Sequence, residues 1–196
     1  WRCSRCGQRQ PIAQPRHFIA AIYGSACTTC QGVGTLREPN PAKLIVAEEL
    51  PLCAGAMYSP GFFPQGYLGK PFNGGYDMLQ ALGNKYGFDP HVTPWREMQP
   101  KAQQVFLFGE DERMQVTFRS RKGRETTRTA RYQGFYELIL NWDTGGTYTD
   151  TLLCPSCRGG RLRPQYLAVK LARFNMQQLA NMPLTKLRQV LQTLKI

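Results

Sequence analysis

Six of the seven cysteines in this sequence occur as pairs separated by two residues, a spacing that suits metal ligation. Cys3 and Cys6 are followed, after 20 residues, by Cys27 and Cys30. Two such turns direct four thiolates at one cation, and four sulfurs at about 2.3 Å complete a tetrahedral zinc shell. The spacing therefore predicts a structural zinc held by Cys3, Cys6, Cys27 and Cys30. A closed shell leaves no position for water, so we expect no catalytic role for this metal.

The third pair, Cys154 and Cys157, is half of a second site. Three interpretations are open: ligands supplied from outside this chain, two thiols that bind no metal, or an internal site that adds Cys53 or a histidine. Cys53 lies in an apolar stretch and is expected in the core. Paired cysteines of this kind favour metal binding in a reducing compartment over a secreted disulfide framework, so we expect a cytoplasmic protein.

The net charge of +12 over 196 residues is unevenly distributed. Residues 113–131 carry seven basic side chains and one acidic one, and residues 151–196 carry eight basic side chains and no acidic one. Residues 44–112 are acidic on balance. Basic segments of this kind attract nucleic acid or anionic membranes. Because no apolar run approaches the ~18 residues of a membrane-spanning helix, we expect no membrane insertion and favour nucleic acid as the partner.

Sequence signatures of catalysis are missing from this chain. It contains no GxxxxGK[ST] phosphate-binding loop, no HExxH and no GxSxG. His17 and His91 are isolated in the sequence. We therefore expect this chain not to be an enzyme.

The most basic segment alternates apolar and polar residues on both sides of Lys122–Gly123, which predicts a β-hairpin with a two-residue turn. In that register Arg119 faces Thr126 and Thr117 faces Arg128, so the arginines share one face. A phosphate backbone would relieve the repulsion between them. We predict sequence-tolerant binding of double-stranded DNA through Arg119, Arg121, Lys122, Arg124, Arg128 and Arg131.

The remaining elements are expected to be short. Hydrophobic periodicity predicts helices over Tyr76–Tyr86, ended by Gly87, and over Pro183–Leu194. A short helix at Tyr136–Trp142 and a short strand at Val105–Gly109 are also expected. The predicted class is α+β, a small antiparallel sheet with packed short helices plus a four-cysteine zinc knuckle. The expected organisation is a zinc module (1–36), a DNA-contacting α+β domain (37–150) and a segment with the third cysteine pair and a terminal helix (151–196).

Seven blocks of the sequence, in chain order, resemble the middle of the UvrA family or of a UvrA-like paralogue: CSRCG, PRHF, ACTTCQGVGT, ELPLCAGAM, KYGFDPHVTPW, LFGE and CPSCRGGRLRPQYLAV. UvrA proteins are the damage-recognition subunits of the bacterial excinuclease ABC. The resemblance implies that this chain is a piece of a longer, dimeric ABC-type ATPase of nucleotide excision repair and the SOS response. Residues 37–150 would be its insertion domain, and the signature region would start at Cys154.

The resemblance also divides the expected activities between this chain and its parent. It implies a damage-sensing DNA contact here, and a second zinc site completed upstream. ATP binding and the contact with UvrB would lie in regions outside this chain. Two alternatives are open: a zinc-dependent chaperone module, because DnaJ-type chaperones share the CxxCxGxG pattern of Cys27–Gly34, and a purely structural spacer.

Overall fold

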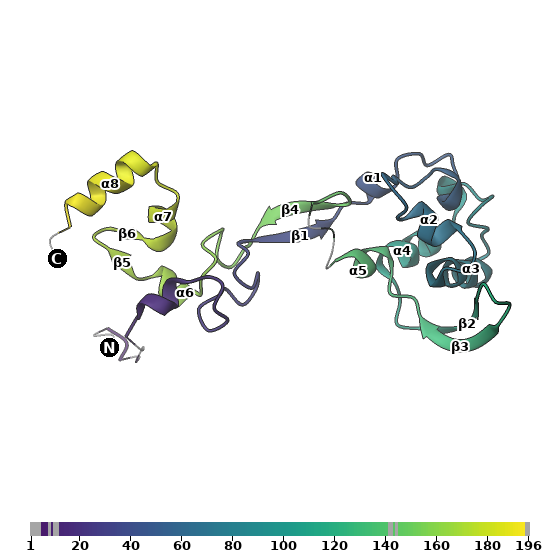
Figure 1. Ribbon diagram of the computed structural model, residues 1–196, viewed down its shortest axis with the longest axis horizontal. Coiled ribbons are helices and arrows are strands. Elements are labelled where there is room, and N and C mark those ends of the chain that lie inside the picture. The colour runs from purple at the N-terminus through teal and green to yellow at the C-terminus, as the bar shows by residue number, and fades with distance from the viewer. Residues whose placement is uncertain (1–4, 8, 10–11, 141–142, 144, 195–196) are drawn as a thin grey trace. The chain divides into compact units, whose positions relative to one another are not determined.

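The computed structural model describes residues 5–7, 9, 12–140, 143 and 145–194 (Figure 1). The chain forms two compact units, one made of residues 1–36 and 151–196 and the other of residues 37–150. The N-terminal segment and the C-terminal segment, expected as separate modules, thus belong to a single unit. No helix in the described ranges is long and apolar enough to cross a membrane.

The first unit is largely irregular backbone gathered around four buried cysteines. The terminal helix expected over Pro183–Leu194 is confirmed as Leu184–Gln192. Short elements make up the rest of this unit: η1 (Pro15–Phe18), α6 (Pro164–Leu167), β5 (Lys170–Leu171), β6 (Phe174–Asn175), α7 (Met176–Ala180) and α8 (Leu184–Gln192).

Two strands carry the chain out of the first unit and back into it. They are β1 (Thr35–Pro39) and β4 (Thr149–Leu153), which pair as a two-stranded sheet. Just beyond them, the buried Asp143 carboxylate accepts hydrogen bonds from the Thr147 and Tyr148 N–H groups at 2.8 and 3.0 Å. The Thr149 hydroxyl donates a third, at 2.8 Å. These bonds fix the turn that precedes β4.

The second unit has its own hydrophobic core under short helices. The helix expected over Tyr76–Tyr86 is confirmed as α3, and it ends at Gly87, whose φ of 73° is the left-handed conformation of a helix C-terminus. The helical elements of this unit are α1 (Pro41–Leu44), η2 (Leu52–Ala54), α2 (Gln65–Gly69), α3 (Gly74–Tyr86), η3 (Trp95–Glu97), α4 (Pro100–Phe108) and α5 (Phe135–Ile139). Helix α5 covers the first part of the helix expected over Tyr136–Trp142; residues 141 and 142 lie outside the described residues.

The strand expected at Val105–Gly109 is wrong, because these residues form the end of α4. Pro100 occupies the first turn, where its missing N–H costs nothing, and good helix formers follow it. Ala102, Val105 and Phe106 then share one face, and all three are fully buried. A short apolar run has no periodicity that separates a strand from a buried helix.

The expected hairpin is present as β2 (Arg113–Arg119) and β3 (Glu125–Arg131), but its register differs by one residue. Arg119 faces Glu125, and Val116 faces Arg128. The Ser120 N–H donates to the Arg124 carbonyl at 2.9 Å, which closes a three-residue loop rather than a two-residue turn. Such loops carry a left-handed residue at their end, and Gly123 has a φ of 76°.

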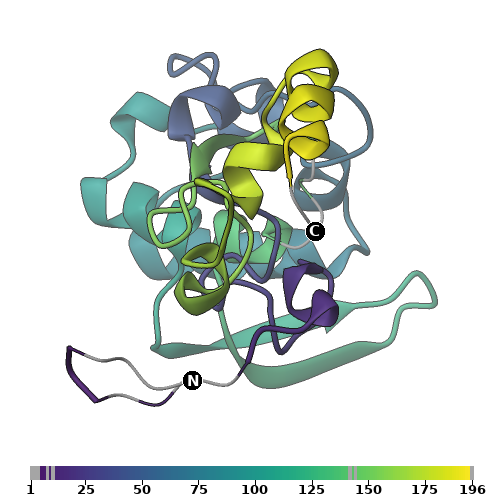
Figure 2. The same cartoon turned by 90° about the vertical axis from the view of Figure 1, so that its left-hand side faces the viewer.

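The changed register separates the basic side chains of the hairpin. Direct partners lie on the same face of a two-stranded sheet, and faces alternate along each strand. Val116, which is fully buried, therefore shares its face with Arg128, whereas Arg119 lies on the opposite face. The expectation of one arginine-lined face is wrong. The hairpin is a twisted ribbon whose strand β2 packs against α3 (Figures 1 and 2).

The loop conformation predicts a specific response to substitution at Gly123. No heavy atom lies within 4 Å of the position that a Cβ would take, so only backbone strain opposes a side chain there. We expect Gly123→Val to lower the free energy of unfolding by about 1–2 kcal/mol. Gly123→Asn should have a smaller effect, because asparagine tolerates the left-handed region. Urea unfolding of both variants tests this; equal destabilisation by Val and Asn would contradict the loop assignment.

The Asp143 hydrogen bonds predict a pH-dependent contribution to stability. Burial alone raises the pKa of Asp143, but the hydrogen bonds from Thr149, Tyr148 and Thr147 outweigh it, and the pKa lies below its usual value. A lowered carboxyl pKa stabilises the fold above the unfolded-state pKa of about 3.9, and this stabilisation is lost as the pH falls through the folded-state value.

We therefore expect Asp143→Asn to lower the thermal midpoint at pH 7, and the difference from the unsubstituted chain to shrink below about pH 4. Thermal unfolding followed by circular dichroism from pH 3 to 7 measures it. Asp111→Asn, at a fully exposed carboxylate, is the control. A pH-independent difference for Asp143→Asn would mean that the charge of Asp143 does not stabilise the fold.

Candidate metal centre and basic loop

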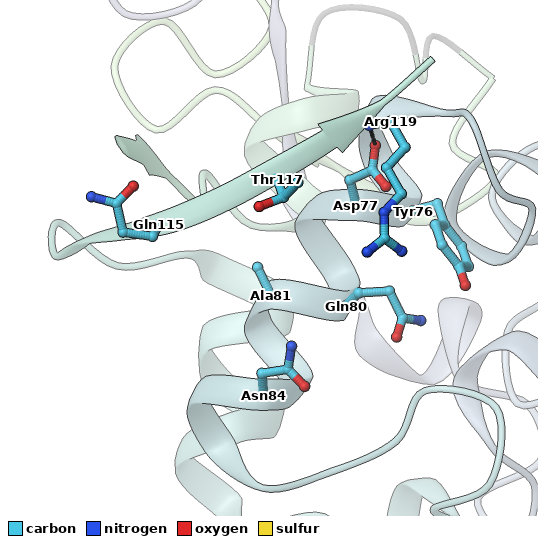
Figure 3. Close-up of a pocket in the computed structure, with 8 residues that line it drawn as sticks. All are labelled: Tyr76, Asp77, Gln80, Ala81, Asn84, Gln115, Thr117 and Arg119. Atoms are coloured by element: carbon cyan, nitrogen blue, oxygen red, sulfur yellow. Dashed lines mark hydrogen bonds between the residues drawn. The ribbon is translucent and has the colours of Figure 1, made fainter. Parts of the chain in front are cut away.

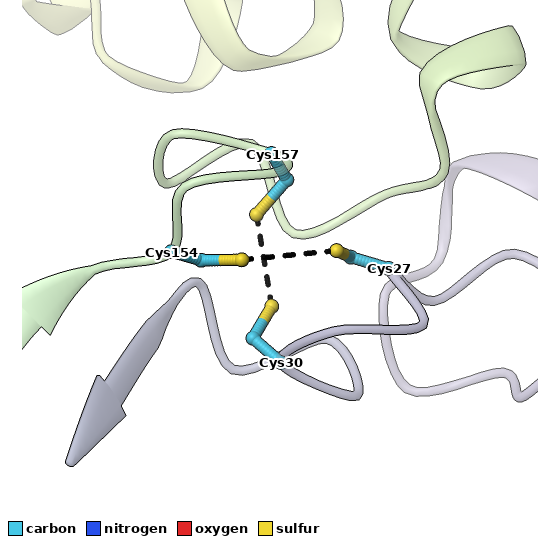
Figure 4. A group of neighbouring side chains, drawn as sticks. All are labelled: Cys27, Cys30, Cys154 and Cys157. Atoms are coloured by element: carbon cyan, nitrogen blue, oxygen red, sulfur yellow. Dashed lines mark hydrogen bonds between the residues drawn. The ribbon is translucent and has the colours of Figure 1, made fainter.

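Four cysteine sulfurs of the first unit lie together: those of Cys27, Cys30, Cys154 and Cys157, all within 4.8 Å of one another (Figure 4). The Sγ atoms of Cys27 and Cys154 are 3.9 Å apart, and those of Cys30 and Cys157 are 3.6 Å apart. A regular tetrahedron with zinc–sulfur bonds of about 2.3 Å places its sulfurs about 3.8 Å from one another. The four sulfurs therefore fit a zinc ion at their centre.

The two cysteine pairs are presented by two knuckles of the same shape. The first reads CTTCQG and the second CPSCRG. In each knuckle the two residues after the second cysteine have positive φ: 51° and 85° for Gln31 and Gly32, and 48° and 84° for Arg158 and Gly159. The repeated turn directs both thiols of each pair inward, so the two knuckles face each other across the cluster.

Backbone hydrogen bonds tie the two knuckles to each other. The Cys27 N–H donates to the Arg161 carbonyl at 2.8 Å, and the Cys154 N–H donates to the Gly34 carbonyl at 3.0 Å. The Gly34 N–H donates to the Cys30 sulfur at 3.1 Å, a contact that favours a thiolate. All four cysteines are buried, at 0–5% exposure. The site is closed to water, which is typical of a structural zinc.

The surroundings of Cys27 and Cys157 shift the pKa values of these two thiols. Burial alone raises the pKa of Cys27, but the N–H groups of Cys30 and Thr29 outweigh it and lower that pKa to about 7. Burial raises the pKa of Cys157 to about 12. The pKa values of Cys27 and Cys157 are therefore shifted in opposite directions by their surroundings. A bound divalent cation compensates the charge and deprotonates the ligating thiols.

The expected zinc ligands are corrected by this geometry. Cys27 and Cys30 are grouped with Cys154 and Cys157, and not with Cys6. Cys3 lies outside the described residues, and Cys6 is an exposed free thiol away from the cluster. None of the three interpretations of Cys154 and Cys157 included this partner pair. Cys53 lies in the core of the second unit, as expected.

Spacing along the chain misled the assignment, because the two ligand pairs are separated by 127 residues. The sequence nevertheless contained a usable signal. The Cys-x2-Cys-x-Gly pattern of Cys27–Gly32 recurs at Cys154–Gly159, whereas the first pair lacks the glycine two residues after its second cysteine. Matching the knuckles by this glycine would have paired the correct segments.

The six basic residues predicted to contact DNA fall into two groups. The Arg119 Nε lies 2.8 Å from Glu125, and an Arg131 nitrogen lies 2.7 Å from Glu137. The Arg128 guanidinium lies over the Phe118 ring, 4.3 Å from its centroid. In contrast, three exposed side chains of the 120–124 loop form no ion pair with any described residue: Arg121, Lys122 and Arg124.

The fold and the two sites define an α+β module with a zinc-type cysteine cluster and a basic hairpin. Residues 41–142 match the family model described as the UvrA DNA-binding domain. The UvrABC system protein A of Mycobacterium bovis is 31% identical over 170 residues, 81% of this chain and 17% of that protein. The same-named protein of Neisseria meningitidis serogroup B is 28% identical over 99% of this chain and 21% of its own length. The chain thus belongs to the UvrA family, and spans about a fifth of the length of these relatives.

A solved structure agrees with this assignment at the level of the fold. The crystal structure of UvrA2 from Deinococcus radiodurans matches with a TM-score of 0.62 at 21% identity. The match covers 93% of this chain and 24% of that chain. The expected α+β class with a four-cysteine cluster is confirmed.

The ligand assignment predicts which cysteines are needed for metal binding. We expect the purified chain to hold one zinc ion at the cluster, and Cys27→Ser or Cys154→Ser to lose it together with much of the thermal stability. Structural zinc contributes on the order of 10 kcal/mol to folding. Metal content by mass spectrometry and thermal unfolding measure both effects.

Cys6→Ser is the matched control, because Cys6 is exposed and outside the cluster. It should keep both the zinc and the thermal midpoint. Loss of zinc from Cys6→Ser, with retention in Cys154→Ser, would restore the quartet expected from the sequence spacing.

Proposed function

We propose that this chain is a non-catalytic, DNA-binding region of a UvrA-type nucleotide excision repair protein. The observation that carries the proposal is the group of hairpin-tip cations that form no ion pair with a described residue, Arg121, Lys122 and Arg124. They lie within the residues that match the UvrA DNA-binding domain. The family membership supports the same reading.

The physical argument for DNA binding rests on the separation of charges along the hairpin. Arg119 and Arg131 have acidic partners, so part of their field is neutralised before any ligand arrives. The tip loop carries three exposed cations in four residues without such partners. Phosphates are the ligands that satisfy exposed guanidinium and ammonium groups, and contacts to phosphate carry no sequence information. We therefore propose sequence-tolerant binding to the DNA backbone, with Arg119, Arg128 and Arg131 contributing less than the tip.

The metal centre has a structural part in this proposal. Its four sulfurs fill the zinc shell, so the ion has no open position for a substrate or water. We propose that zinc holds the first unit together and has no catalytic role. ATP hydrolysis, dimerisation and contact with UvrB are proposed to reside in other regions of a longer parent protein.

Removing the tip cations tests the proposal. We expect Arg121→Ala/Lys122→Ala/Arg124→Ala to weaken duplex binding and to reduce the slope of log affinity against log salt by about 0.9 for each lost phosphate contact. Fluorescence anisotropy with a duplex of random sequence, from ~50 to ~200 mM salt, measures both quantities.

A charge-matched control separates a local contact from net charge. Lys170→Ala/Arg173→Ala/Lys186→Ala removes three exposed cations from the first unit and should change the salt slope less than the tip variant. Equal effects of the two variants on the salt slope would contradict the assignment of the DNA contact to the hairpin tip. Binding of unfolded client protein without any binding of DNA would support the chaperone alternative, and neither activity would support a spacer.

A further inference from the structure

A polar cavity of about 320 Å³ lies between α3 and β2, on the face of the hairpin opposite the core (Figure 3). Side chains from the strand and from the helix face each other across it. The lining residues that matter for its chemistry are Tyr76, Gln80 and Asn84 from α3, and Gln115, Thr117 and Arg119 from β2.

Contacts between α3 and β2 hold the two walls of the cavity in place. The Asp77 carboxylate accepts the backbone N–H of Arg119 at 3.1 Å, which ties the start of α3 to the end of β2. On the other face of the hairpin, Val116 and Leu79 are fully buried in the core. The walls therefore belong to two packed elements whose spacing is fixed from both sides.

One polar atom of the cavity lacks a partner. The Gln80 Nε2 is buried, and it has no hydrogen bond to any described residue. A buried donor without an acceptor is unfavourable, so this amide is poised to bind an acceptor on a ligand. Because Gln80 lines the cavity, a ligand that enters it can supply that acceptor.

The lining defines the class of ligand. Gln80 and Asn84 each carry a donor and an acceptor side by side, and Tyr76 adds an aromatic ring. On the strand side, the Gln115 Nε2 donates to the Thr129 hydroxyl at 3.2 Å and the Thr117 and Thr127 hydroxyls are 2.8 Å apart, so the helix supplies the groups open to a ligand. The charges nearby are engaged: the Asp77 carboxylate accepts the Arg119 N–H, and the Arg119 Nε binds Glu125. The cavity therefore suits a neutral planar group with alternating donors and acceptors more than it suits a phosphate. Carboxamides pair with the edges of nucleobases in this way, and aromatic rings stack on their faces.

We propose that this cavity receives one unpaired nucleobase of the bound DNA, an inference that rests on the proposed DNA-binding function. Arg119 at the rim is two residues from Arg121 in the tip loop. At about 3.3 Å per residue along a strand, the cavity and the tip cations are spaced for the base and the backbone of neighbouring nucleotides. Moving a base out of the stack costs least where it is mismatched, damaged or unpaired. The cavity thus gives a sequence-tolerant contact a preference for disturbed DNA.

The test compares a duplex that contains one bulged adenine with its fully paired counterpart, by fluorescence anisotropy with the full chain. We expect the unsubstituted chain to bind the bulged duplex about tenfold more tightly, the discrimination that one good bidentate contact supplies. Gln80→Leu should lose this preference and keep its affinity for the paired duplex. Asn84→Leu, at an exposed position, is a second variant in case Gln80→Leu unfolds. Gln104→Leu, at an exposed position of α4 away from the cavity, is the matched control.

The outcomes separate this inference from the proposed function. Equal affinity of the unsubstituted chain for both duplexes would overturn the inference and leave DNA binding intact, whereas binding of neither duplex would remove the proposed function itself. Unchanged preference in Gln80→Leu and Asn84→Leu would place the base elsewhere. Titration with adenosine distinguishes the source of the base: tight binding of free adenosine without a preference for the bulge would overturn the assignment to DNA.

Discussion

The four-cysteine cluster is the contact on which the rest of the molecule depends, because it joins segments 127 residues apart. Closing a loop of that length costs about 4 kcal/mol of chain entropy. Zinc binding to four thiolates is worth on the order of 10 kcal/mol or more, so a single ion is sufficient to hold the closure. Strands β1 and β4 leave the two knuckles and pair with each other, which brings both ends of the second unit together. Along the chain, the second unit is thus inserted between the two cysteine pairs.

Within the second unit, the hairpin has strands that are fixed by packing and a tip loop that is exposed. The strands are fixed because Met114 and Val116 lie in the core and because Asp77 holds the backbone of Arg119. In the loop beyond them, no heavy atom of a described residue outside the immediate chain neighbours lies within 4 Å of the position that a Cβ would take at Gly123. Acidic partners pair with Arg119 and Arg131 on the strands, whereas the tip cations form no ion pair with any residue that the structure describes. A binding group on a short loop between fixed strands keeps its position and remains accessible to a large ligand.

The sequence predicted those features whose cause is local. Periodicity with a terminal glycine was enough for α3, periodicity alone for α8, and alternation for the existence of the hairpin. The predicted hairpin register was wrong, because it depends on whether Gly123 ends a two-residue or a three-residue loop. That difference of one residue moves every side chain of β3 to the other face relative to β2. The strand predicted at the end of α4 was wrong, because burial of one helical face outweighed the strand-like character of a short apolar run. The predicted cysteine partners were wrong because proximity in space was inferred from proximity in sequence.

The corrected register also changes what the hairpin can discriminate. A face lined by arginines would contact phosphates along its whole length and would treat all duplexes alike. In the actual register the face that lines the polar cavity carries Gln115 and Thr117, which are uncharged and hydrogen-bond to Thr129 and Thr127 across the hairpin. In our proposal the tip cations supply affinity and the polar cavity supplies selectivity, from neighbouring places on the same hairpin. Because a base in a regular stack hides its faces and its pairing edge, we expect a cavity of this kind to respond to the ease with which a base leaves the helix rather than to the sequence around it.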